Sequence, residues 1–92
     1  MAENQRAEIL FSGHVQGVGF RFTAARIARN FAMTGYVKNL RDGRVELVAE
    51  GTAEEINAFV EAVGREMGRN ISDIKRSWRP AKGEFTGFGI SH

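Results

Sequence analysis

The hydrophobic period changes within residues 7–31, AEILFSGHVQGVGFRFTAARIARNF. Ala7, Ile9 and Phe11 fall on one face of an extended chain, which predicts a strand. From residue 20 the apolar residues recur at helical spacing, which predicts a helix with one buried stripe. The members of this stripe are Phe20, Ala24, Ile27, Ala28 and Phe31. Glycines at 13, 17 and 19 keep the residues between strand and helix out of regular structure.

The remaining sequence continues the alternation of strands and helices. Residues 35–39 and 45–50 are predicted strands, joined by a hairpin turn at Asp42-Gly43. Thr52-Ala53-Glu54-Glu55 forms a capping box that begins a second helix. The expected buried residues of this helix are Ile56, Phe59, Val60, Val63 and Met67. Residues 72–79 read as a fourth strand ended by Pro80, and Phe85, Phe88 and Ile90 mark a last short strand.

The order of elements predicts the fold class. Two strand–helix–strand units with right-handed crossovers place both helices on one face of an antiparallel sheet. We therefore predict an α+β fold, the ferredoxin-like βαββαβ sandwich, with four to five antiparallel strands. A chain of 92 residues suits one domain, expected over residues 7–92 behind a flexible N-terminus of residues 1–6. This fold hosts many functions and by itself argues for none.

The composition excludes several classes of protein. Without cysteine there is no disulfide, no thiol nucleophile and no thiolate metal site. No stretch approaches the ~20 apolar residues that span a bilayer, and residues 1–6 lack the apolar core of a secretory signal. We therefore expect a cytoplasmic protein. No metal ligands cluster in the sequence, so no metal and no cofactor are expected.

The charge distribution points to an anion site at the first helix. No Asp or Glu occurs between Ile9 and Arg41, although five basic residues do. Arg21 lies in the opening turn of the helix, where a cation is unfavourable by ~0.3–1 kcal/mol unless an anion joins it. The preceding glycine-rich loop can turn its N–H groups inward as a phosphate-binding nest. The alternative is a glycine-rich connection that binds nothing.

Asn39 is the second candidate residue. In this fold the first and second strands run parallel on either side of the third, so their carboxyl ends meet at one edge. Two strand spacings are about 10 Å, which allows Arg21 and Asn39 to meet over a small ligand. The alternative is that Asn39 only satisfies its own turn before Asp42-Gly43.

Two motifs resemble the signatures of the acylphosphatase family. The first is Gly13-His14-Val15-Gln16-Gly17-Val18-Gly19-Phe20-Arg21, and the second is Gly35-Tyr36-Val37-Lys38-Asn39. Glu50-Gly51 and the closing Phe88-Gly89-Ile90 also follow the family pattern. Two departures lie outside the motifs. Ala32 stands where many members have a glycine that ends the first helix, and residues 67–70 replace a frequent Gly-Pro.

The resemblance implies a metal-independent hydrolase that cleaves acyl phosphates to a carboxylate and inorganic phosphate. It assigns phosphate binding to Arg21 and to the loop residues His14, Val15, Gln16, Gly17, Val18 and Gly19. It assigns the orientation of the attacking water to Asn39. We expect His14 on the loop surface rather than acting as a general acid. The expected partners are small acyl phosphates, with inorganic phosphate as product and inhibitor; a monomer that binds neither nucleic acid nor membrane is expected.

Two other functions fit parts of the sequence. Residues 82–90 faintly resemble the aromatic strand of RNA-recognition motifs, but that motif belongs on the third strand of such a domain and here lies on the last. A catalytically weak acylphosphatase-like domain of hydrogenase-maturation carbamoyltransferases is a closer alternative. Those domains are embedded in much longer chains, whereas this sequence starts at Met1 and ends after its last strand, which favours an independent enzyme.

Overall fold

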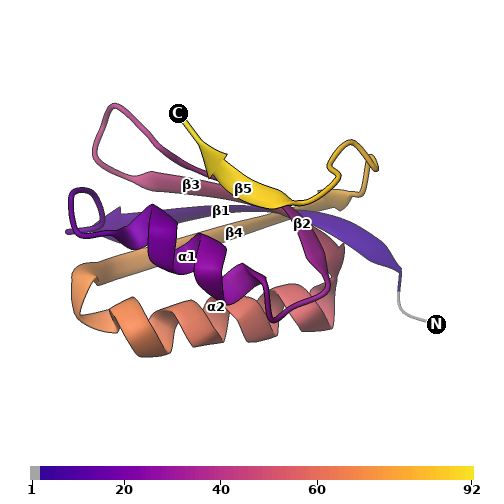
Figure 1. Ribbon diagram of the computed structural model, residues 1–92, viewed down its shortest axis with the longest axis horizontal. Helices are drawn as coiled ribbons and strands as arrows, with labels where there is room; N and C mark the ends of the chain where they lie inside the picture. Colours follow the sequence, from indigo (N-terminus) through magenta and orange to yellow (C-terminus); the bar gives the residue numbers. More distant parts are fainter. Residues whose placement is uncertain (1–2) are drawn as a thin grey trace.

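The computed structural model describes residues 3–92, which form five strands, two α-helices and one short 3-10 helix. The elements in chain order are β1 (Asn4–Gly13), α1 (Phe20–Ala28), β2 (Met33–Asn39), β3 (Val45–Thr52), α2 (Ala53–Met67), η1 (Gly68–Asn70), β4 (Ile71–Pro80) and β5 (Phe88–Ser91). Both helices lie on one face of the sheet (Figure 1). The predicted ferredoxin-like arrangement is therefore confirmed.

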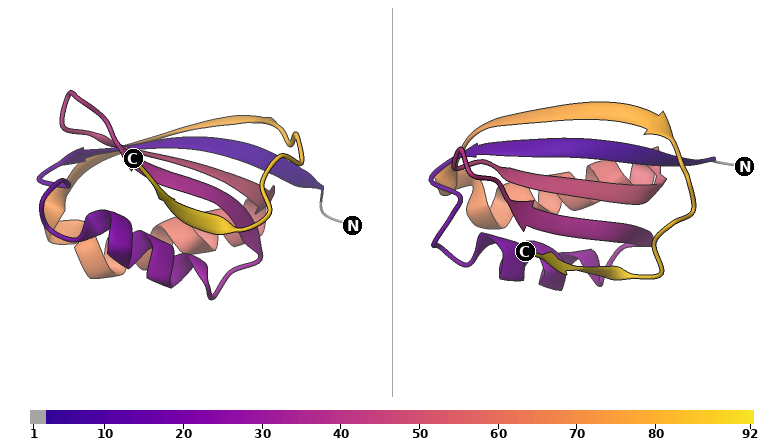
Figure 2. Two further views of the ribbon diagram at one scale, coloured as in Figure 1. Left: turned by 45° about the horizontal axis from the view of Figure 1, so that its top comes forward. Right: turned by 90° about the horizontal axis from the view of Figure 1, so that it is seen from above.

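The five strands have the order β4-β1-β3-β2-β5 (Figure 2, right). β3 pairs antiparallel with both β1 and β2, so β1 and β2 run parallel to each other, as predicted. β5 pairs parallel with β2, from Gly35↔Phe88 to Lys38↔Ser91. The sheet is thus mixed rather than wholly antiparallel. The long connection from β4 crosses to the opposite edge of the sheet and sets this direction (Figure 2).

The core lies between the sheet and the two helices. β1 contributes Ala7, Ile9 and Phe11, all fully buried, and the helices contribute most of their predicted stripes. Phe20, Ile27, Ile56, Phe59, Val60 and Val63 are buried as predicted. Phe31 and Met67 are only partly buried. Phe31 follows the end of α1 at Ala28 and packs edge-on against Phe59 from a turn.

Two strand boundaries differ from the prediction. The first strand begins at Asn4 rather than at Ala7, and Arg6 is buried beside Glu50. Of the N-terminal residues 1–6 that were predicted to be flexible, residues 1 and 2 lie outside the described residues. The last strand begins at Phe88, because Phe85 lies in the loop before β5 and packs edge-on against Tyr36.

The capping box of α2 forms in part. The hydroxyl of Thr52 accepts a hydrogen bond of 3.2 Å from Glu55 N, as the sequence predicts. The Glu55 carboxylate accepts instead from the backbone N–H of Ala32, at 2.7 Å. This bond ties the turn after α1 to the start of α2, which accounts for a chain reversal at a position without glycine.

Candidate active site

A pocket of about 270 Å³ lies where the carboxyl ends of β1, β2 and β5 meet the start of α1. Its walls are Val15, Gly17, Gly19, Phe20, Arg21, Phe22, Asn39, Ile90 and His92. The glycine-rich loop, Arg21 and Asn39 thus face one space, although Arg21 and Asn39 are far apart in sequence. Figure 1 shows the β1–α1 loop and the β2–β3 turn at the same end of the sheet.

The central strand aligns the two halves of this site. Val45 of β3 pairs with Phe11 on one side and with Asn39 on the other. Phe11 stands just before the glycine-rich loop, so the loop and Asn39 begin at the same level of the sheet. This is the juxtaposition that the predicted strand order requires.

The loop between β1 and α1 has the backbone of an anion nest. Gly17 and Gly19 both take a left-handed φ of 76°. Since none of the described residues other than glycine has a positive φ, the sign of φ alternates from Gly17 through Val18 to Gly19. Such alternation turns successive N–H groups toward one side of the chain, where they bind oxyanions. Gly19 is also the N-cap of α1, whose first turn contains no acidic residue.

The other loop residues differ in their surroundings. Val15 is buried in the core, and Val18 packs against the core from a partly buried position. His14 is exposed and is not part of the pocket wall, as expected for a surface residue. Val15, Gly17 and Gly19 of the predicted phosphate-binding set therefore line the pocket, and His14, Gln16 and Val18 do not.

Gln16 fastens the loop to the turn that follows Asn39. Its Nε2 atom donates to the carbonyl oxygens of Leu40 at 2.7 Å and of Arg44 at 3.0 Å. Both acceptors belong to the β2–β3 turn, which begins directly after Asn39. The side chain of Gln16 therefore fixes the position of the β1–α1 loop relative to Asn39, although Gln16 does not line the pocket.

Asn39 has a polar atom without a partner. Its Oδ1 atom is buried and accepts no hydrogen bond from any of residues 3–92. The neighbouring turn is closed by other groups, because Leu40 N donates to Arg44 O at 2.8 Å and Asp42 Oδ1 accepts from Arg44 N at 3.0 Å. The hydrogen bond to Arg44 N lowers the pKa of Asp42 below its usual value. Asn39 Oδ1 thus takes no part in the hydrogen bonds that close the turn after β2.

Arg21 extends from the first turn of α1 toward the end of β5. Its Nη1 atom lies 3.5 Å from the carbonyl oxygen of Ser91 and 3.3 Å from Nδ1 of His92. The first contact is at the long limit of a hydrogen bond. The guanidinium therefore lies in the pocket with only weak contacts to oxygen among the described residues.

Four pocket residues were not predicted as site residues, namely Phe20, Phe22, Ile90 and His92, although Phe20 was predicted as a core residue. Ile90 lies in β5 and His92 follows it, and they reach the pocket because β5 runs parallel to β2 and ends beside it. An antiparallel last strand would have finished at the opposite end of the sheet, away from the pocket. Phe22 is next to Arg21 in α1, and its 69% exposure marks it as an apolar side chain outside the core.

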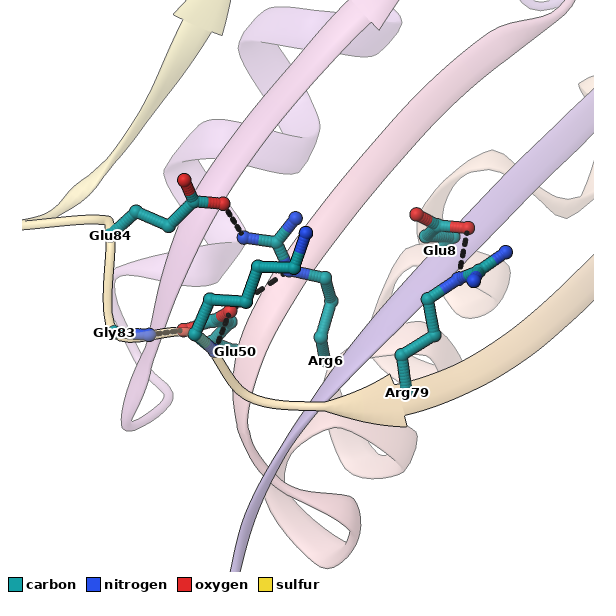
Figure 3. Close-up of polar contacts among 7 residues, drawn as sticks. Arg6, Glu8, Glu50, Arg79, Gly83 and Glu84 are labelled. Carbon is teal, nitrogen blue, oxygen red and sulfur yellow. Dashed lines mark hydrogen bonds and ion pairs between the residues drawn. The ribbon is translucent and has the colours of Figure 1, made fainter.

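A buried ionic cluster anchors the loop that leads into β5 (Figure 3). Glu50 accepts hydrogen bonds from Arg6 Nε at 2.9 Å, from Lys82 N at 2.8 Å and from Gly83 N at 2.9 Å. Arg6 also pairs with Glu84 and lies 5.0 Å from the ring centre of Phe85. The loop before β5 is therefore held to β1 and β3, which fixes where β5 starts.

The cluster also determines the ionisation of Glu50. Burial alone would raise the pKa of this carboxyl, but the hydrogen bonds from Lys82 N–H and from Arg6 outweigh burial and hold the pKa below its ordinary value. The hydrogen bond to Glu50 contributes most to raising the pKa of Arg6. Both groups are charged at neutral pH, and each stabilises the other's charge.

Comparison with known proteins identifies the family. The family model described as Acylphosphatase matches residues 7–90. The chain belongs to the acylphosphatase family. A protein of Anaeromyxobacter sp. (strain Fw109-5) named acylphosphatase is 42% identical over 93 residues, which cover 100% of both chains.

Solved structures agree with this family assignment. The crystal structure of acylphosphatase from Bacillus subtilis superposes with a TM-score of 0.85 at 33% identity, covering 96% of this acylphosphatase-family chain and 99% of the other. The crystal structure of T. kodakarensis HypF matches with a TM-score of 0.81 and 36% identity over 95% of this chain, but this match covers only 12% of HypF. The same domain thus occurs alone and within a much longer protein.

Residues 3–92 contain no helix with the length and apolar character that a membrane span requires. Within the same range, no three His, Asp or Glu side chains gather where they could hold a metal ion.

Proposed function

We propose that this protein hydrolyses the carboxyl–phosphate bond of acyl phosphates, yielding a carboxylate and inorganic phosphate. The backbone N–H groups of the β1–α1 loop (residues 14–19), with Gly17 and Gly19 at the pocket wall, and the guanidinium of Arg21 bind the phosphoryl group, and Asn39 orients the attacking water. The observation that carries the proposal is the single pocket of about 270 Å³ that Gly17, Gly19, Arg21 and Asn39 share. Membership of the acylphosphatase family supports the choice of substrate.

The chemistry requires little beyond positioning. Water attacks phosphorus in line, the bond between phosphorus and the acyl oxygen breaks, and the electron pair leaves with the carboxylate. Because the conjugate acid of a carboxylate has a pKa near 4, the leaving group needs no protein acid. The proton of the water passes to a phosphoryl oxygen, so the products are a carboxylate and dihydrogen phosphate or its conjugate base. No protein base is required.

Two tasks remain for the pocket: it neutralises the phosphoryl oxygens, and it orients the attacking water. The N–H groups of the nest, the positive end of α1 and the guanidinium of Arg21 neutralise the phosphoryl oxygens, on which charge spreads during transfer. The free Oδ1 of Asn39 accepts a hydrogen bond from the water and fixes its approach. Displacement of the weak contacts of Arg21 with Ser91 and His92 frees its donors for phosphate.

The wider proposal is a cytoplasmic, metal-independent monomer that acts on small acyl phosphates and binds no nucleic acid. Phe85 and Phe88 support this view, because they are engaged with Tyr36 and with Phe59 rather than presented as a stacking surface. Catalysis that needs no acid, base or metal ligand is consistent with a site whose walls contain glycines, Arg21 and Asn39.

The test is hydrolysis of benzoyl phosphate by the wild-type protein and by Arg21→Gln. We expect the substitution to lower kcat/KM by ~10³-fold or more, the scale known for arginines that stabilise phosphoryl transfer. Competitive inhibition by inorganic phosphate should disappear with it. Arg69→Gln, an exposed arginine in η1, is the matched control and should retain both properties. Phosphate binding without hydrolysis in the wild type would instead indicate a phosphate-binding module, and loss of activity on adding a chelator would refute the mechanism.

A further inference from the structure

A second hollow adjoins the pocket and shares two of its walls. It has a volume of about 280 Å³ and lies between the outer side of α1 and β5. We refer to it as the side groove, and its walls are Phe22, Ala25, Arg26, Arg29, Phe88, Gly89 and Ile90. Phe22 and Ile90 also line the phosphate pocket. The two hollows therefore lie next to each other, with these two side chains at their common boundary.

The walls of the side groove are apolar where the groove meets the pocket. Phe22 is 69% exposed and Ile90 is 39% exposed, so two of the three large exposed hydrophobic side chains among the described residues lie at this groove. Gly89 also lines the groove, where it contributes backbone atoms alone. The groove thus has two exposed apolar side chains, Phe22 and Ile90, at its boundary with the pocket.

Farther along α1 the groove is bounded by basic side chains. Residues 22, 25, 26 and 29 follow the i, i+3, i+4, i+7 spacing of one helix face. Arg26 is paired with Glu66 of α2, whereas Arg29 forms no ion pair with any of the described residues. The carbon stems of arginines cover apolar surface, and guanidinium groups attract the faces of aromatic rings.

We propose that the side groove binds the acyl group of the substrate and selects acyl phosphates whose acyl group is an aromatic ring or a comparably large apolar group. The inference rests on the proposed function, since it needs the phosphoryl group in the neighbouring pocket. In an in-line displacement the leaving group departs on the side away from the water. The side groove adjoins the pocket, and Asn39, the residue proposed to hold that water, is not among its lining residues. The groove is therefore the space into which the acyl group would extend.

The size of the groove agrees with this class of acyl group. A cavity of about 150 Å³ is enough for a benzene ring, and the side groove offers about 280 Å³. A phenyl ring there covers Phe22 and Ile90, whereas an acetyl group is too short to leave the phosphate pocket. The expected result is a preference for benzoyl over acetyl phosphate that originates in Phe22 and Ile90.

The experiment measures the ratio of kcat/KM for benzoyl phosphate to kcat/KM for acetyl phosphate. Phe22→Ala removes the shared wall and should lower this ratio about tenfold, the scale for losing apolar contacts in a substrate pocket. Ala25→Trp fills the groove at a residue that does not line the phosphate pocket, and should also lower the ratio. Trp78→Ala is the matched control, because Trp78 is 38% exposed on β4 at the opposite edge of the sheet.

The outcomes separate this inference from the proposed function. If the wild type hydrolyses both acyl phosphates and the ratio stays within twofold in folded Phe22→Ala and Ala25→Trp, the groove does not bind the acyl group. A ratio that falls equally in Trp78→Ala would also overturn the inference, because the effect would not be local. If the wild type hydrolyses neither compound, the proposed function itself fails, and the inference with it.

Discussion

Replacement of Asn39 by alanine separates water orientation from phosphate binding. If Oδ1 of Asn39 orients the water, its hydrogen bond is made mainly in the transition state. Removal of one such preorganised group lowers kcat by ~10²–10³-fold, about 3–4 kcal/mol. KM and the inhibition constant for phosphate should change little, which is the pattern for an interaction absent from the ground state.

The structure also gives the sign of the effect on stability. Oδ1 is buried and accepts no hydrogen bond within residues 3–92, so alanine breaks no bond to this atom. An unsatisfied buried polar atom destabilises a fold by about 1–3 kcal/mol. We therefore expect Asn39→Ala to keep or slightly raise the free energy of unfolding while activity falls. Loss of activity together with unchanged or increased stability is the signature of a residue held in place for function.

The assay combines benzoyl phosphate kinetics, inhibition by inorganic phosphate and the urea midpoint on one preparation of Asn39→Ala. Asn30→Ala, at an exposed asparagine after α1, is the matched control and should resemble the wild type in all three. A lowered urea midpoint with near-normal kcat in Asn39→Ala would refute the reasoning, because it would make Asn39 a structural residue of its turn.

Two further predictions concern residues that hold the site from outside. Gln16→Ala removes the two bonds to Leu40 O and Arg44 O; it should lower the free energy of unfolding by about 1–3 kcal/mol, measured by urea unfolding, and weaken phosphate inhibition as well as kcat. Unchanged phosphate inhibition in this variant would contradict a role in fixing the loop. The depressed pKa of Glu50 predicts that its stabilisation is complete above the ordinary glutamate pKa of about 4.3 and is lost as pH falls through the lower folded-state pKa. Urea midpoints measured against pH should therefore fall at acid pH in the wild type and fall less steeply in Glu50→Gln; parallel curves would show that Glu50 is not the titrating group.

Much of the fold could be predicted because the sequence signals are local. The alternation at Ala7, Ile9 and Phe11 and the cap at Thr52 each depend on neighbouring residues, and both appear in the structure. The strand order β1-β3-β2 followed from the handedness of the crossovers. The direction of β5 could not be predicted, because a four-residue strand after a long loop has no crossover rule of its own.

The direction of β5 explains why Ile90 and His92 were absent from the site prediction. Arg21 and Asn39 depend on β1, α1 and β2, whose arrangement was predictable. Ile90 and His92 depend on β5 running parallel to β2, and the parallel pairing depends on a loop held by Glu50. A buried ion pair between Arg6 and Glu50 leaves no periodic signal in the sequence. Ile90 and His92 were therefore missed for the same reason as the start of β1 at Asn4, namely a buried ion pair between residues far apart in sequence.

The register of β3 connects the fold to the chemistry. Val45 is fully buried and pairs with both Phe11 and Asn39. A slip of one residue on either side would turn the side chains of that strand to the opposite face of the sheet. Phe11 would then leave the core, or Asn39 would leave the pocket. Because burial of Phe11, Leu47 and Val37 makes such a slip unfavourable, the hydrophobic pattern that folds the sheet also sets Asn39 at the level of the anion loop. The geometry of the site is in this sense a consequence of core packing, and the two hydrogen bonds of the Gln16 side chain tie the loop to the turn.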